Sequence, residues 1–94
     1  MSRKRFKKVG EVMSITDCRG GIITCLPERF KGTRRHHIRE LSESLYAFTF
    51  IRQSRAFLYD TALVVYNSAN LTYTLVSINT NQTADDVIKE LCNG

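Results

Sequence analysis

Two clusters of basic side chains are the clearest candidates in this sequence for binding a ligand. Five cations stand between residues 3 and 8 and five more between residues 29 and 39; in chain order they are Arg3, Lys4, Arg5, Lys7, Lys8, Arg29, Lys31, Arg34, Arg35 and Arg39. Lysine and arginine bind phosphate oxygens largely without regard to base sequence. The clusters therefore predict non-specific binding of a nucleic acid, either DNA or RNA, by the N-terminal half.

The charge of the chain is distributed unevenly. Residues 1–39 hold eleven basic and three acidic side chains, a net charge of +8, whereas residues 40–94 hold three basic and six acidic ones, a net charge of −3. The positive end of such a chain attracts polyanions or acidic proteins. A second interpretation is therefore a non-catalytic interaction or inhibitory module, such as a viral accessory protein, that docks on an acidic partner. A third is that the cations form a solvated surface.

Aromatic side chains could add base stacking to these charges. Seven of the nine lie between residues 46 and 73, where a buried sheet face is the favoured interpretation. Phe6 differs, because it lies within the first basic cluster, where burial is difficult to arrange. Its ring is predicted to stack on a base or on a partner.

Patterns typical of catalysis and metal binding are missing from the sequence. Cys18 and Cys25 are separated by six residues and have no matching pair near Cys92. His36 and His37 are adjacent, so on a helix they would point about 100° apart and could not share a metal ion. We therefore expect a protein that is not an enzyme and that holds no metal or cofactor.

The cysteines and the hydropathy bear on location. The three cysteines are odd in number and unevenly spaced, which favours reduced thiols in the cytoplasm. The basic run at the N-terminus also suits a nuclear-import signal if the source is eukaryotic or viral. No apolar stretch approaches the roughly 20 residues of a membrane-spanning helix, so no membrane partner is expected.

The elements that must position these residues belong to one small domain. A chain of 94 residues is too short for two independent cores, so we expect a flexible basic arm over residues 1–8 and a single domain over residues 9–94. Strand-like residues flank Gly20 and Gly21, a pair that can turn the chain with positive φ. This pattern predicts an N-terminal hairpin over about residues 9–26.

The segment after the hairpin has helical spacing. Ile38, Leu41 and Leu45 stand at positions i, i+3 and i+7, and Thr33 is of a residue type that caps helices. These features predict a helix over residues 34–45. Its N-terminus would then carry the second basic cluster, where free backbone N–H groups add to the attraction for phosphate.

The C-terminal half alternates between apolar and polar residues, as half-buried strands do. Three strands are predicted over about residues 46–51, 56–66 and 71–78. A polar break at residues 52–55 and turn-forming residues at 67–70 separate them. Short connections of this kind favour an antiparallel meander.

The last segment predicts a second helix, because Thr83 and Asp86 resemble a capping box. The expected fold is thus an α+β domain of order ββαβββα, in which an antiparallel sheet, formed by the N-terminal hairpin and the meander, is packed by two helices. The unpaired edge of the meander also predicts a homodimer with a continuous sheet.

Overall fold

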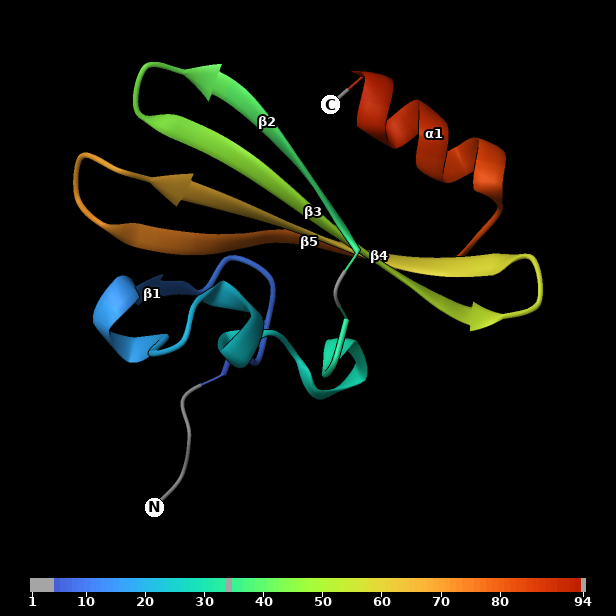
Figure 1. Cartoon of the computed structure of the whole chain (residues 1–94), viewed down its shortest axis with the longest axis horizontal. Helices are drawn as coiled ribbons and strands as arrows, with labels where there is room; N and C mark the ends of the chain where they lie inside the picture. The colour runs from blue at the N-terminus through green and yellow to red at the C-terminus, as the bar shows by residue number, and fades with distance from the viewer. Residues whose placement is uncertain (1–4, 34, 94) are drawn as a thin grey trace.

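The protein is described by a computed structural model that covers residues 5–33 and 35–93 (Figure 1). Within these residues it is a five-stranded antiparallel sheet of order β1-β5-β4-β3-β2, with one α-helix and three short 3-10 helices. The elements are β1 (Val12–Ser14), η1 (Ile15–Asp17), η2 (Ile22–Cys25), η3 (Glu28–Phe30), β2 (His36–Ser42), β3 (Leu45–Arg55), β4 (Leu58–Asn67), β5 (Thr72–Gln82) and α1 (Ala84–Asn93).

The predicted order ββαβββα, with two helices, is wrong. The segment predicted as a helix, residues 34–45, contains strand β2, which pairs antiparallel with β3. In that pairing Ile38 lies opposite Phe48 and Glu40 lies opposite Tyr46. The backbone hydrogen bonds that a helix makes within itself are made here to β3, whose aromatic and β-branched residues favour a sheet.

The predicted N-terminal hairpin over residues 9–26 is also wrong. Of that range only Val12–Ser14 is a strand, and it pairs with β5, where Met13 lies opposite Tyr73. The apolar run after Gly21 forms the 3-10 helix η2 instead of a returning strand. The strands β3, β4 and β5 do lie in the region where the meander is expected.

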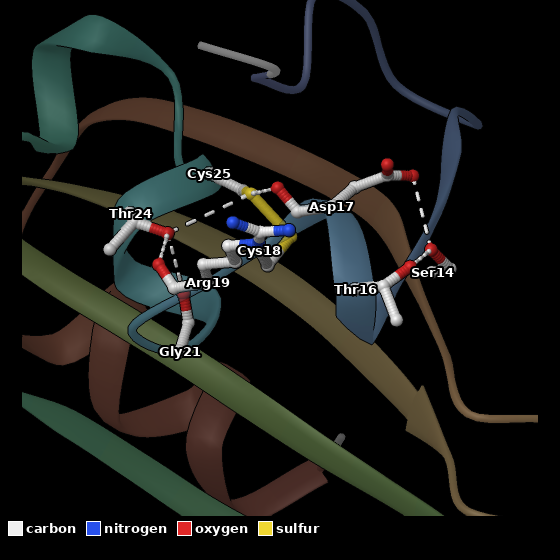
Figure 2. The surroundings of a disulfide bond; sticks show 8 residues. All are labelled: Ser14, Thr16, Asp17, Cys18, Arg19, Gly21, Thr24 and Cys25. Carbon is white, nitrogen blue, oxygen red and sulfur yellow. Dashed lines mark hydrogen bonds between the residues drawn. A yellow bond between two sulfur atoms is a disulfide. The ribbon is translucent and has the colours of Figure 1, made fainter.

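A disulfide explains the compact course of the N-terminal segment (Figure 2). Cys18 and Cys25 are bonded through their sulfur atoms, with Cα atoms 5.6 Å apart, and both side chains are buried. The hydroxyl of Thr24 donates a hydrogen bond of 2.8 Å to the carbonyl oxygen of Gly21 inside the same loop. The expectation of reduced thiols is therefore wrong for this pair. Cysteine count alone could not show that the intervening turn brings the two residues together.

The hydrophobic core lies between this N-terminal segment and one face of the sheet. Leu26 and Phe30 are fully buried and belong to the same cluster as Val64 of β4 and Leu75 of β5. Phe6 belongs to this cluster as well. Figure 1 shows the segment, coloured blue to teal, lying along one side of the strands.

Helix α1 lies on the opposite face of the sheet. Neighbouring side chains of a strand point to opposite faces, so Thr61 points away from the face on which Ala62 joins the core. The hydroxyl oxygen of Thr61 lies 2.7 Å from Oε1 of Gln82 and 3.0 Å from Oε2 of Glu90 in α1. This polar contact attaches the helix to the centre of the sheet.

The predicted capping box at the start of α1 is present. The backbone N–H of Asp86 donates to Oγ1 of Thr83 at 3.2 Å, and the N–H of Thr83 donates to Oδ2 of Asp86 at 3.3 Å. The helix is ten residues long. Within the described part of the chain, no helix has the length and apolar content that a membrane crossing requires.

Candidate polyanion-binding cleft

A cleft of about 310 Å³ lies beside the loop that joins η3 to β2. We call it the basic cleft; its walls are formed by Lys31, Gly32, Thr33, Arg35, Ile51, Arg52 and Gln53. Three of these seven residues are cationic and none is acidic. The cations come from three places in the chain: the loop after η3, the residue before β2, and the interior of β3. Positive charge from separate segments is therefore concentrated at one concave surface.

The loop that carries Lys31 is held in a defined shape. The N–H of Lys31 donates to the carbonyl oxygen of Glu28 at 3.0 Å, and the N–H of Thr33 donates to that of Phe30 at 3.0 Å. Gly32 has a φ of 82°, which is unstrained only for glycine. The buried ring of Phe30 anchors the loop to the core, so Lys31 is presented from a fixed backbone.

Arg52 is oriented by a buried carboxylate. Its Nη1 lies 3.0 Å from Oδ2 of Asp60, which stands directly opposite on β4. Asp60 is buried, and its Oδ1 accepts a 3.1 Å hydrogen bond from the backbone N–H of Asn81. A guanidinium has five N–H donors in a planar fork, so this ion pair fixes the orientation of Arg52 and leaves further donors. The side chain of Arg52 is 34% exposed, and Arg52 lines the cleft.

An apolar hollow of about 160 Å³ adjoins the basic cleft. Its walls are Arg35, Ile51, Tyr59, Ala84, Val87 and Ile88. Arg35 and Ile51 line both spaces, so the two hollows share a wall. A charged group bound in the basic cleft would therefore lie beside a surface that accepts a flat apolar group.

The strand conformation of residues 36–42 distributes the second basic cluster differently from a helix. Side chains two residues apart on a strand share a face, which places His37 and Arg39 together. Both line a small hollow of about 40 Å³ between β2 and α1, together with Glu90. The N-terminus of a helix, which was expected to assist phosphate binding at these residues, is not formed there.

The other predicted cations have varied surroundings. Arg5 Nη1 lies 2.8 Å from Oε2 of Glu28, so its charge is partly neutralised. Lys7, Lys8 and Arg29 are exposed but do not line the basic cleft. The remaining predicted residues, Arg3, Lys4 and Arg34, lie outside the described part of the chain.

Of the predicted residues, the structure thus brings Lys31 and Arg35 together. Arg52, the third cation of the basic cleft, was assigned to a polar break by the sequence pattern. The signal that could have found it is the hairpin register, which sets Arg52 opposite Asp60.

The two candidate stacking residues, one predicted and one found in the structure, have opposite environments. Phe6, the predicted one, is 2% exposed, and its N–H donates to the carbonyl oxygen of Cys25 at 2.9 Å. Its ring is therefore enclosed in the core and is not accessible to a base. Phe57 lies at the tip of the β3–β4 hairpin, is 84% exposed, and has a φ of 68°. An aromatic residue in the left-handed region is uncommon and costs free energy.

The basic cleft must be interpreted from its own residues. Comparisons with protein-family models, with curated proteins and with solved structures give no match for this chain. Among residues 5–33 and 35–92, no group of three or more His, Cys, Asp or Glu side chains is placed to hold a metal ion. The basic cleft offers three cationic side chains to an anion, and one of them, Arg52, is already paired with Asp60.

Proposed function

We propose that this protein binds the phosphate backbone of a nucleic acid through the basic cleft. The observation that carries the proposal is the convergence of Lys31, Arg35 and Arg52 on one concave surface without an acidic residue in its wall. Arg52 is paired with Asp60, and Nζ of Lys31 lies 3.9 Å from Oε1 of Glu28, but both cations keep N–H donors beyond these partners. A phosphate group can accept several charge-assisted hydrogen bonds from such donors at once.

Single strands fit the surroundings of the cleft better than a duplex. Recognition of single strands combines phosphate contacts with stacking of exposed bases on aromatic rings. Tyr59 lines the apolar hollow next to the cleft, and Phe57 presents a free ring at the hairpin tip. A base that is paired within a duplex could not reach either ring.

The exposed cations outside the basic cleft support the same function at longer range. Lys7, Lys8 and Arg29 add positive charge to the N-terminal segment, which raises the rate of encounter with a polyanion. Their contribution decreases with ionic strength, because exposed charges are screened over about 8–10 Å at physiological salt.

The proposal is tested by fluorescence anisotropy with labelled 12-nucleotide strands of DNA and RNA and with the corresponding duplexes. Titrations at several KCl concentrations compare the wild-type protein with a Lys31→Gln/Arg35→Gln variant. The matched control is Arg19→Gln/Lys89→Gln, which removes the same charge at exposed positions outside the basic cleft.

We expect the cleft variant to bind single strands at least about tenfold more weakly and to flatten the slope of log K against log salt by about 1.4, or 0.7 per lost phosphate contact. The control should change both quantities much less. Absence of binding to every nucleic acid at low salt, or an equal loss in the control, contradicts the proposal and turns attention to an acidic protein partner.

A further inference from the structure

Strand β2 forms a long exposed edge of the sheet. Its neighbour is β3, and no strand of the described chain lies on its other side. Six of its seven residues are exposed, among them Ile38 at 51% and Leu41. The opposite edge, β1, is only three residues long. A seven-residue edge without proline that carries exposed apolar side chains is a template for pairing with another strand.

The backbone of β2 offers hydrogen bonds outward at defined residues. The N–H of Ile51 donates to the carbonyl oxygen of Arg35 at 3.1 Å, which marks that pair as hydrogen-bonded. Because bonded and non-bonded pairs alternate in an antiparallel ladder, the N–H and C=O groups of Ile38 and Glu40 point away from β3. These groups require water or a further strand.

The sequence of β2 is complementary to itself in one register. A two-fold axis perpendicular to the sheet pairs two β2 strands antiparallel and keeps matching faces together. The registers that overlap five or more residues are centred on Ile38, Arg39 or Glu40. Centring on Arg39 or on Glu40 sets two like charges directly opposite each other, which is destabilising. Centring on Ile38 sets Ile38 against its own copy, His36 against Glu40 and His37 against Arg39, and it places no two identical charges opposite each other.

The Ile38 register also continues the apolar face of the sheet. Ile38 lies opposite Phe48 of β3, and Phe48 packs against the core cluster. A second copy would therefore extend one row of apolar side chains from Phe48 through Ile38 to the same residues of the partner. Cross-strand apolar pairs of this kind are the unit of sheet stabilisation.

We propose that two copies of this chain dimerise by antiparallel pairing of their β2 strands about Ile38, which joins two five-stranded sheets into one of ten strands. The inference does not depend on the function of the basic cleft. Five paired residues on each side make a small interface, so the dimer should be weak and dissociate on dilution.

Analytical ultracentrifugation tests the dimer directly. The wild-type protein should change with concentration from a mass of 10.8 kDa to twice that value. Ile38→Lys places two like charges at the centre of the interface and should weaken association at least about tenfold. The matched control is Val12→Lys, an apolar residue of similar exposure, 57%, on the opposite edge, and it should dimerise like the wild type. A wild-type protein that stays monomeric up to several hundred micromolar, or a dimer that Ile38→Lys leaves intact, overturns the inference.

Cysteine cross-linking tests the register without relying on the folding of Ile38→Lys. In a background with Cys92→Ser, single cysteines replace Ile38, Arg39 or Glu40 and are oxidised mildly. Residues directly opposite in a hydrogen-bonded pair have Cα atoms about 5.5 Å apart, within disulfide range. Ile38→Cys should form covalent dimers most efficiently. Preferential cross-linking at residue 39 or 40 contradicts the Ile38 register, and equal absence of cross-links at all three contradicts the dimer.

Discussion

Replacing Phe57 by glycine should make the protein more stable and a weaker binder of single strands. Phe57 has a φ of 68° and is 84% exposed, so its ring gains little from burial while its backbone stays in the left-handed region. That conformation costs about 1–2 kcal/mol for an ordinary residue and nothing for glycine. Glycine loses about 0.5–1 kcal/mol through the larger entropy of its unfolded chain. The net stabilisation is therefore about 0.5–1 kcal/mol, or about 3–6 °C in Tm for a domain of this size.

The same substitution removes the ring proposed to stack on a base. Stacking of one base on an aromatic side chain contributes about 1–3 kcal/mol, so the affinity should fall roughly 5- to 150-fold. Thermal melting and anisotropy titration of the same preparation measure both effects. Phe57→Tyr, which keeps the ring and the strain, serves as the control and should change neither quantity. Phe57→Asn, which tolerates positive φ but lacks the ring, should behave like the glycine variant.

Two results would refute this reasoning in different ways. A lower Tm for Phe57→Gly would mean that the ring makes stabilising contacts, so that the exposed tip is a structural feature of the hairpin. An unchanged affinity with a raised Tm would mean that the strain is real but that Phe57 does not contact nucleic acid. The second result leaves the phosphate contacts of Lys31 and Arg35 to be tested separately, because those residues lie in the basic cleft.

Three further predictions concern stability. Asp60→Asn should lower the free energy of unfolding by about 2–4 kcal/mol in urea titrations, because Arg52 loses its buried ionic partner; a loss below about 0.5 kcal/mol would show that the pair is solvated. Reducing the Cys18–Cys25 disulfide frees a short loop in the unfolded chain and should lower the free energy of unfolding by about 2–3 kcal/mol by the loop-entropy relation. The loss should appear as a lower Tm in the presence of dithiothreitol than in its absence. Burial, together with the nearby Tyr66, raises the pKa of Tyr73, so the folded state keeps this proton at a pH where the unfolded state loses it. Stability should therefore be constant below about pH 10, the ordinary tyrosine pKa, and decline above it, and Tyr73→Phe should reduce that decline.

The parts of the fold that the sequence predicts correctly are those encoded by local signals. Thr83 and Asp86 make the reciprocal hydrogen bonds of a capping box, because both partners lie within one turn. The C-terminal strands alternate over most of their length, and short turns join them. In each case the residues that determine the structure are neighbours in the chain.

The structure of the N-terminal half is determined by contacts between residues that are distant in sequence. The spacing of Ile38, Leu41 and Leu45 satisfies a helix, yet Ile38 and Leu41 lie on β2, and Leu45 is the first residue of β3, the strand with which β2 pairs. Phe6 stands among cations in the sequence and still lies in the core, where its N–H donates to the carbonyl oxygen of Cys25 in the disulfide loop. Neither the strand conformation of β2 nor the burial of Phe6 can be predicted from the composition of its own segment.

The candidate site also combines residues that local sequence signals reveal with residues that only contacts distant in sequence bring together. Lys31 and Arg35 are visible as part of a charged cluster, whereas Arg52 joins them only through the register of a hairpin. Phe57 resembles a core residue in the sequence and proves to be an exposed ring on a strained turn. Natural chains depart from local preferences mainly where something other than folding is served. Three cations at one cleft and an aromatic residue with positive φ are two such departures, and the proposed binding of a single-stranded polyanion would account for both.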